Sequence, residues 1–345
     1  MSTPKAPVEQ VTERKFYLDI LKIIATFGVI FLHVFAKGYN GALNTCIWYV
    51  AAVGDSLVRW SVPVFVMISG VLFLDPLKEL SVSAIVRKYV KRLLLAYVFW
   101  YFVYCLFNFV RTYLSSDSIV LGYKSFEPEY HLWFLPMLMG VFLLVPILRF
   151  VASDIKLLIY SLTLWIVYVA ISFVVVRYVP HISSIFQMNI VVGYAGYFLL
   201  GYFLSLDTLS KHQRQTLYFF SLVGAAITVV GSIVFSLFLG HACSRFLKEL
   251  SPQVIMVSTA VFLFVMRQSP GIERRLSRFT DYVRKDLFGI YLVHVFWLEV
   301  FYLGFKSYMY NHVFSYVLFP LIVFLFSLYT TKLLRKIPFI SQFVE

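Results

Sequence analysis

Charged residues are scarce in this sequence. Asp, Glu, Lys and Arg make up 14% of the 345 residues, whereas hydrophobic residues make up 61%. A soluble domain carries roughly 25% charged residues, because it needs them to cover its surface. The scarcity argues against an ordinary soluble protein and indicates a protein whose solvent is a lipid bilayer.

Cysteines are also few. Cys46, Cys105 and Cys243 lie far apart and show neither a CxxC nor a Cys/His spacing. Neither a disulfide framework nor a metal site is therefore predicted, and we expect no bound cofactor. The net charge of +13 would suggest nucleic acid in a soluble protein. Here the charges stand between apolar runs, so topology and lipid headgroups explain them and no nucleic-acid partner is expected.

Long apolar runs dominate the chain. Runs of about 20 residues can cross a bilayer as helices, and these lack the two-residue alternation of a transmembrane β-barrel. We therefore predict an all-α, polytopic membrane bundle of about ten transmembrane helices. The predicted spans are residues 17–37, 47–74, 90–113, 131–151, 155–178, 188–206, 214–240, 252–268, 286–305 and 312–334. Residues 1–345 are expected to form a single membrane domain with tails at 1–16 and 335–345.

Basic residues lie mainly in alternate loops. The loops on the side of the N-terminus hold about three times as many Lys and Arg residues as the others, and the positive-inside rule makes that side cytoplasmic. Both termini are therefore predicted to be cytoplasmic, with the protein in the inner or plasma membrane of the cell. The most basic cytoplasmic loop is predicted at 267–285.

The first span carries polar residues that lipid would not tolerate. On a helical wheel, Asp19, Thr26 and His33 lie within about 60° of Lys22, so all four share one face. About 16 Å separates Lys22 from His33 along the helix. An anion held near Lys22 can thus extend a flexible arm to His33, whose imidazole is the usual type of proton acceptor in acyl transfer. Asp19 either assists His33 or simply pairs with Lys22 near the headgroups.

The second span contains Asp55 and Arg59 one helical turn apart, followed by Pro63 and the pair Ser69–Gly70. Pro63 leaves a backbone hydrogen bond unmade, and Ser69–Gly70 permits close helix packing or a break. Either Asp55 and Arg59 form an ion pair that relieves the cost of burial, or Arg59 lines a polar path.

A basic cluster precedes the third span. It consists of Arg87, Lys88, Lys91 and Arg92. Positive-inside bias alone would produce such a cluster, and phosphate binding is the alternative explanation.

Two further spans contain histidines. At the start of the fourth, Trp133 fits an aromatic belt, whereas His131 is a candidate for contact with a substrate from outside. In the ninth, Tyr291 and His294 share one helix face. His294 is either a buried histidine with satisfied hydrogen bonds or part of a substrate path.

Together these motifs resemble the acyltransferase 3 family of integral membrane O-acyltransferases, and within it the stand-alone type that acetylates enterobacterial common antigen. The resemblance rests on YLDILKIIATFGVIFLHV, RWSVPVFVMISGVLF, the basic cluster, YHLWFLPMLMGVFLLVPILR and FGIYLVHVFWL. It implies acyl-coenzyme A as cytoplasmic donor, a sugar hydroxyl on the far side as acceptor, and a first-helix Arg followed after ten residues by an essential His. His33 occupies the His position, and Lys22 replaces the Arg. Lys keeps the charge but loses the bidentate fork of a guanidinium.

The prediction is therefore a membrane O-acyltransferase, most simply an O-acetyltransferase, that acylates a surface or lipid-linked carbohydrate. His33, with Asp19, is the predicted catalytic residue, as a general base or as a brief carrier of the acyl group. The residues predicted to bind acyl-CoA or stabilise negative charge are Lys22, Arg59, Arg87, Lys88 and Arg92. The residues predicted to line the acceptor path are His131, Trp133, Tyr291 and His294.

Two alternatives stay open at this point. Polar stripes and a proline-broken span also suit a transporter or flippase that exports a saccharide or small solute. A membrane scaffold is the other alternative, and the aligned charged stripe of the first span disfavours it.

Overall fold

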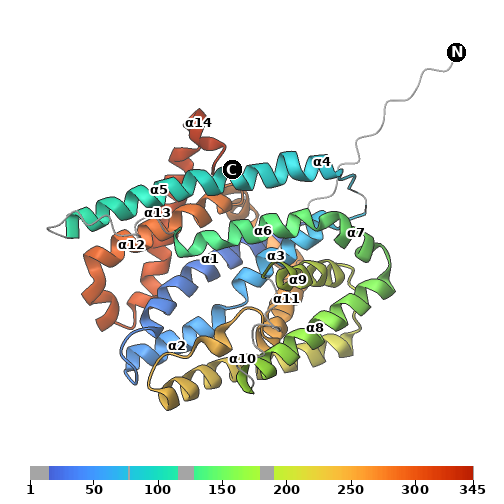
Figure 1. Cartoon of the computed structure of the whole chain (residues 1–345), viewed down its shortest axis with the longest axis horizontal. Coiled ribbons are helices and arrows are strands. Elements are labelled where there is room, and N and C mark those ends of the chain that lie inside the picture. The colour runs from blue at the N-terminus through green and yellow to red at the C-terminus, as the bar shows by residue number, and fades with distance from the viewer. Residues whose placement is uncertain (1–14, 77, 116–127, 179–189, 345) are drawn as a thin grey trace.

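The computed structural model describes residues 15–76, 78–115, 128–178 and 190–344, and every regular element in these ranges is helical (Figure 1). Residues 1–14 of the predicted N-terminal tail and the start of the predicted span 188–206 lie outside these ranges. The long helices are α1 (Phe16–Tyr39), α2 (Cys46–Val58), α3 (Ser61–Phe73), α5 (Lys91–Ser115), α8 (Ile155–Tyr178), α9 (Ile190–Ser205), α10 (Lys211–Leu239), α11 (Pro252–Val283), α12 (Leu287–Asn311) and α13 (Ser315–Leu334). The shorter elements are α4 (Val82–Ala84), η1 (Ile85–Val90), η3 (Tyr130–Trp133), α6 (Phe134–Leu143), α7 (Val145–Ser153), η5 (Ser244–Leu247) and α14 (Pro338–Ser341).

The predicted spans recur as helices. Within the described ranges, eight helical segments are long and apolar enough to cross a membrane, one of them α2 and α3 taken together. A ninth candidate is the pair Tyr130–Leu143 and Val145–Ser153, bent by 55°, and α9 is a shorter apolar helix. Pro146, in the first turn of α7, cannot donate a backbone hydrogen bond to the preceding turn, which accounts for the bend. The prediction of a polytopic helical membrane bundle is confirmed.

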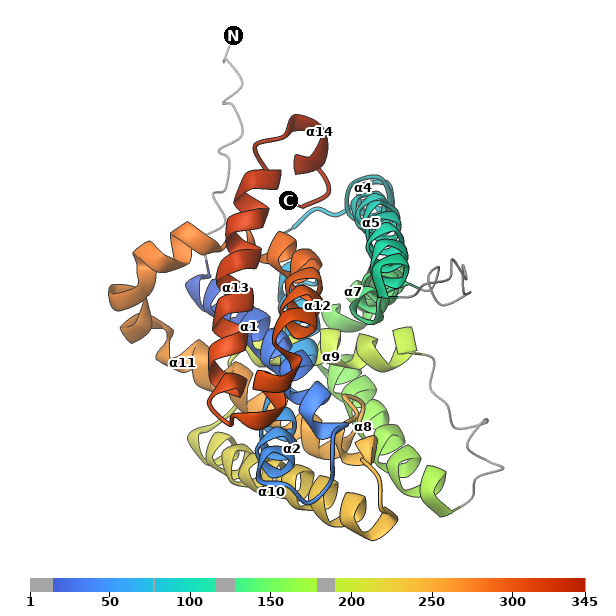
Figure 2. The ribbon, with the colours of Figure 1, turned by 90° about the vertical axis from the view of Figure 1, so that its left-hand side faces the viewer.

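Helix α1 lies at the centre of the bundle. It contacts α2, α3, α11, α12 and α13 (Figures 1 and 2). In the most apolar 18-residue stretch of α1, 67% is buried inside the protein. The corresponding buried share is 22% in α8 and in α10. The polar stripe of α1 therefore faces other helices, where charged groups find partners, rather than lipid.

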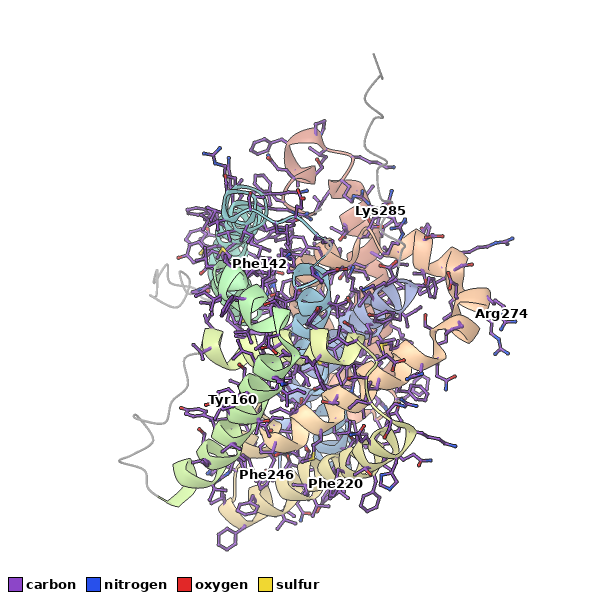
Figure 3. The ribbon with its side chains drawn as sticks, turned by 90° about the vertical axis from the view of Figure 1, so that its right-hand side faces the viewer. Phe142, Tyr160, Phe220, Phe246, Arg274 and Lys285 are labelled. Atoms are coloured by element: carbon purple, nitrogen blue, oxygen red, sulfur yellow. The ribbon has the colours of Figure 1, made fainter. Side chains whose placement is uncertain are left out.

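The outer helices expose large apolar side chains. Phe102 on α5, Leu222 on α10 and Phe238 on α10 are 64%, 73% and 83% exposed. Tyr160 and Phe220 likewise lie on the outer helices α8 and α10 (Figure 3). In a membrane, the hydrocarbon chains of the lipids cover an exposed apolar surface of this extent on a helical bundle.

Helices α3 and α9 cross with their backbones in contact. A Cβ atom at Gly70 would lie 1.8 Å from the carbonyl oxygen of Phe198, and one at Gly201 would lie 2.1 Å from that of Met67. Only glycine fits at these two positions, as in other close crossings of membrane helices. Ser69–Gly70 therefore serves close packing and not a helix break.

The second predicted span is interrupted at Arg59 and Trp60, between α2 and α3. Pro63 has no N–H to donate to the carbonyl of Arg59, four residues earlier, so the ladder of helical hydrogen bonds is interrupted at this point. A Cβ atom at Gly28 of α1 would lie 2.8 Å from Cβ of Ser61. The interruption thus sits where α1 and α3 cross.

Two predicted segments differ from expectation. The basic segment 267–285 is not a loop, because α11 continues to Val283. Ile272, Leu276 and Phe279 recur at helical spacing and make this part of α11 amphipathic, and Arg274 points away from the bundle (Figure 3). Residues 335–344 of the predicted tail 335–345 fold back against α5, where the indole of Trp100 donates to the carbonyl oxygen of Phe343 at 3.1 Å (Figure 2).

Candidate active site

A cavity of about 400 Å³ lies beside α1. Its wall is mostly apolar and comes largely from α3, α6 and the start of α12. The polar side chains that line it are Lys22, His33, Ser69, Tyr89, Arg92, His131, Glu249, Arg284, Lys285 and Tyr291, together with the indole of Trp133. An apolar cavity with a few convergent polar groups is the usual form of a small-molecule site.

Both ends of the predicted stripe on α1 reach this cavity. Lys22 and His33 line the same space, as a shared path between a cationic group and the imidazole requires. Asp19 pairs with Lys22 at 3.7 Å. Since Asp19 precedes His33 by fourteen residues of continuous helix, about 21 Å, its carboxylate does not reach the His33 ring. Its position fits pairing with Lys22 near the end of the helix.

Basic residues gather at one end of the cavity. Lys22 precedes His33 by eleven residues on α1, and Lys285 precedes His294 of α12 by nine residues. The rings of His33 and His294 stack on one another, and Lys22 and Lys285 line the same cavity, each about 15 Å along the chain from its histidine. The full set at this end is Lys22, Arg92, Arg284 and Lys285. Four cations around one opening favour a ligand with several negative charges.

Three histidines lie together at the other end, where His33 and His131 line the cavity and His294 packs behind them without lining it. The rings of His33 and His294 are 5.3 Å apart with an interplanar angle of 25°, and the His131 ring lies 5.3 Å from that of His294. The ring of Tyr130 lies 5.0 Å from that of His33. The hydroxyl of Tyr291 donates to the carbonyl oxygen of His131 at 2.5 Å and ties α12 to η3. Elements remote in sequence thus bring three imidazoles together.

Several ring nitrogens in this cluster are buried without a protein partner. Nδ1 of His294 lies 2.5 Å from the carbonyl oxygen of Tyr291. Within the described ranges, Nε2 of His294 and both ring nitrogens of His131 have no hydrogen bond of normal geometry. A buried polar atom without a partner costs free energy unless a ligand or water satisfies it. No three His, Cys, Asp or Glu residues of the described part are arranged to hold a metal ion.

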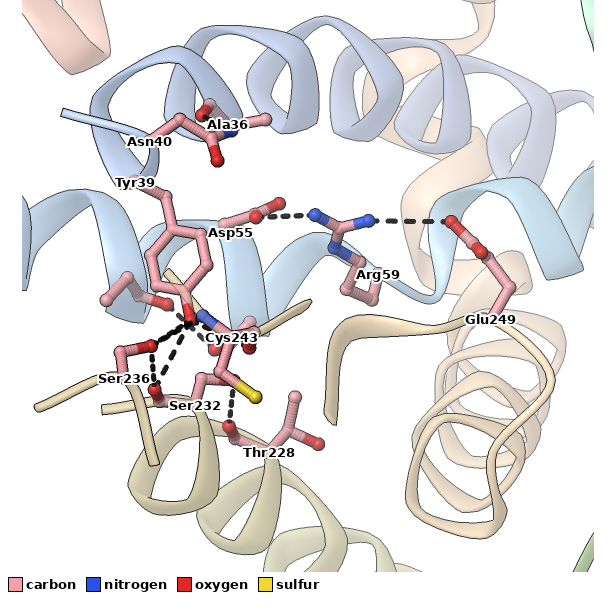
Figure 4. A network of polar contacts seen from close by, with 12 residues as sticks. Ala36, Tyr39, Asn40, Asp55, Arg59, Thr228, Ser232, Ser236, Cys243 and Glu249 are labelled. Atoms are coloured by element: carbon pink, nitrogen blue, oxygen red, sulfur yellow. Dashed lines mark hydrogen bonds and ion pairs between the residues drawn. The ribbon is translucent and has the colours of Figure 1, made fainter. Parts of the chain in front are cut away.

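Three charged residues form a chain of ion pairs that ends at the cavity. Arg59 contacts Asp55 at 2.5 Å and Glu249 at 3.5 Å (Figure 4). The Asp55 side chain is fully buried, and Glu249 reaches the cavity. The structure therefore contains the Asp55–Arg59 ion pair that burial of a guanidinium calls for. Arg59 itself is not among the residues that line the cavity.

A second ion-pair network lies next to the histidines. Glu299 of α12 contacts Lys37 of α1 at 2.8 Å and Arg111 of α5 at 3.2 Å. Lys37 is one helical turn beyond His33, so these pairs tie together three helices that surround the histidine end. Burial, and to a lesser degree the Glu299 carboxylate, raise the pKa of the neighbouring Glu129.

Not every predicted residue lies at the cavity. Arg87 and Lys88 are exposed on η1, and neither lines the space, whereas Arg92, one turn further on, does. Trp133 lines the cavity with its ring 5.7 Å from that of Tyr194.

Sequence reasoning missed Glu249, Arg284 and Lys285 as site residues. Arg284 and Lys285 contributed only to the charge bias of the loops, although their place directly before α12 was a usable signal. Glu249 follows η5 in the connection between α10 and α11. This connection folds into the bundle, with Leu247 and Ser251 buried, and no periodic pattern in the sequence marks it.

The described residues therefore define a membrane-embedded protein with one cavity that joins a cationic end to a cluster of histidines. Residues 15–334 match the family model Acyl_transf_3, described as an acyltransferase domain. The match covers nearly the whole chain, so the chain belongs to the acyltransferase 3 family and is a membrane acyltransferase. Searches of curated proteins and of solved structures gave no match.

Proposed function

We propose that the protein is an O-acyltransferase, most simply an O-acetyltransferase of the type that modifies enterobacterial common antigen. It moves an acyl group from cytoplasmic acyl-CoA to a hydroxyl of a cell-surface or lipid-linked carbohydrate. The observation that carries this proposal is that Lys22 and His33 line one cavity with cations at one end and imidazoles at the other.

The cavity suits a donor of the coenzyme A type. Such a donor carries phosphates at one end and a thioester at the end of a long flexible arm. Lys22, Arg92, Arg284 and Lys285 offer charge-assisted hydrogen bonds to the phosphates. The arm then follows the apolar wall over about 15 Å and brings the thioester to His33. The positive-inside rule supports a cytoplasmic location for the cationic end.

His33 acts as the general base in this proposal. Its imidazole takes the proton of the acceptor hydroxyl while the hydroxyl oxygen attacks the thioester carbonyl carbon. The bond from carbon to sulfur breaks, and the coenzyme A thiolate leaves and takes up the proton from His33. Nδ1 of His294 lies 2.5 Å from the carbonyl oxygen of Tyr291 and therefore carries the ring proton. Nε2, buried without a partner, is left as a hydrogen-bond acceptor on the ring that stacks on His33.

The remaining predicted residues have supporting roles. Asp19 positions Lys22, with which it pairs. Arg87 and Lys88, being exposed outside the cavity, attract the anionic donor without binding it in the site. His131, Trp133 and Tyr291 line the path of the acceptor.

Two linked measurements test the proposal. Surface glycans of cells with and without the protein are compared by mass spectrometry, and a difference of one acyl group is expected. The purified protein in nanodiscs is then given radiolabelled acetyl-CoA with the extracted unmodified glycan, and label is expected in the glycan. Glycan that crosses a vesicle membrane unmodified, with no consumption of acetyl-CoA, would instead support a transporter.

A further inference from the structure

We propose that Glu249 binds the acceptor, and that the part of the acceptor in the cavity is an uncharged polyol, such as a neutral sugar ring. This inference rests on the proposed function and specifies its acceptor. Glu249 is the only carboxylate among the described residues that line the cavity. A carboxylate accepts hydrogen bonds and donates none, so it fits hydroxyl groups of a ligand.

The ion pairs among Asp55, Arg59 and Glu249 leave the Glu249 carboxylate able to accept further hydrogen bonds. Arg59 contacts Asp55 at 2.5 Å but Glu249 at 3.5 Å. The guanidinium charge is therefore balanced mainly by the buried Asp55, and the pair is close to neutral. Glu249 contributes the surplus negative charge of the three residues. Its oxygens are oriented by Arg59 but remain able to accept hydrogen bonds from a ligand.

The surroundings of Glu249 hold it in place. The hydroxyl of Tyr197 donates to the backbone carbonyl oxygen of Glu249 at 2.5 Å. Asp55 and Arg59 lie at the point where α2 gives way to α3, and α3 contacts α1 through Ser61 and Gly28. The same framework that positions Glu249 is thus attached to the helix that carries His33.

An aromatic surface lies in the same cavity. Trp133 lines it, and Tyr194 supports the Trp133 ring at 5.7 Å. An indole and a carboxylate that line one cavity suit a sugar, whose C–H groups pack on aromatic rings and whose hydroxyls donate hydrogen bonds. A carboxylated acceptor would place two negative charges together in a site of low polarity, which is unfavourable.

The test uses pairs of acceptors that differ only at C6, where the hexoside carries a hydroxymethyl group and the hexuronide carries a carboxylate. Methyl hexosides and the corresponding methyl hexuronides are offered to the full chain in nanodiscs with radiolabelled acetyl-CoA. The wild-type protein is expected to acetylate the neutral member of each pair at least about tenfold faster, the effect of one charge-assisted hydrogen bond. Equal or faster acetylation of the hexuronides would overturn the proposal.

Two variants extend the test to Glu249 itself. E249A is expected to raise KM for the neutral acceptor about tenfold while KM for acetyl-CoA stays unchanged, and E249Q to reduce the discrimination against hexuronides. E273Q, at an exposed glutamate of α11, is the control. An unchanged acceptor KM in E249A, or undiminished discrimination against hexuronides in E249Q, contradicts the inference. If the wild-type protein consumes no acetyl-CoA with any acceptor, the proposed function fails instead.

Discussion

The imidazole rings of His33 and His294 stack at 5.3 Å although the two residues come from α1 and α12, at opposite ends of the chain. The contact joins the base proposed for acyl transfer to a second ring with an unpartnered nitrogen. It also explains why neither helix alone makes the site. His33 lines the cavity at the end remote from the four basic residues, whereas His294 is not among the lining residues and contacts the site through the His33 ring.

Replacement of His33 by alanine is expected to lower acyl transfer at least a hundredfold, because loss of a general base removes about that much rate. H294A, which leaves His33 in place, is expected to lower kcat less and to leave KM for acetyl-CoA unchanged. Label transfer from acetyl-CoA to glycan is measured. His212, exposed at the start of α10, provides the control H212A. Full activity in normally inserted H33A protein removes the catalytic assignment.

Arg92 and Arg87 form a matched pair for the donor end. Both are exposed arginines at the start of the same helical segment, but only Arg92 lines the cavity. R92Q is expected to raise KM for acetyl-CoA about tenfold, the value of one charge-assisted phosphate contact, and R87Q by less than about twofold. Equal effects of the two variants would show that general attraction, and not a bound phosphate, explains the basic cluster.

Gly70→Ala tests the close crossing of α3 and α9. The added methyl group would lie 1.8 Å from the carbonyl oxygen of Phe198, so the helices must separate. We expect a loss of stability of about 1–3 kcal/mol or more, seen as a lower unfolding temperature in detergent. Gly271→Ala is the control, because nothing lies within 4 Å of its new methyl group, and alanine is the better helix former.

Glu129→Gln tests the burial of a carboxylate beside the ion pairs that Glu299 forms with Lys37 and Arg111. Burial raises the pKa of Glu129, so the folded protein favours the protonated form. Stability is therefore lost as pH rises through the raised pKa. E129Q is expected to raise the unfolding temperature at neutral pH by about 1–3 °C.

The gain from E129Q is expected to vanish below the ordinary glutamate pKa of 4.5, where both proteins are uncharged at this position. Unfolding temperatures are recorded from acid to neutral pH. E273Q, at an exposed glutamate, is expected to show no such pH dependence. A gain that is constant with pH would mean that charge burial is not its cause.

Much of the fold follows from the sequence because lipid imposes strong rules. A span must be long, apolar and helical, so the ten predicted runs recur as helical segments. The stripe from Lys22 to His33 is predictable for the same reason, since charges in a span face protein. The amphipathic part of α11 was missed because its arginines obey the same charge bias as a loop, although Ile272 and Leu276 carry a helical period.

The contacts between residues on different sides of the cavity could not be predicted from the sequence. Glu249 lies in a connection without periodicity, and its role depends on Arg59, which is almost two hundred residues earlier. The three histidines were each candidates, but their stacking depends on how α1, η3 and α12 pack. Such packing is set by side-chain shape and not by hydrophobic pattern.

The crossing at Gly70 and Gly201 also bears on how substrates come and go. Helix α3 supplies one long wall of the cavity, and its main chain abuts that of α9, so this wall can neither slide nor rotate without collision. Entry of a bulky donor therefore relies on movement of the other helices that line the cavity, α5 and α12 among them, which Tyr104 joins by donating to the carbonyl oxygen of Leu292.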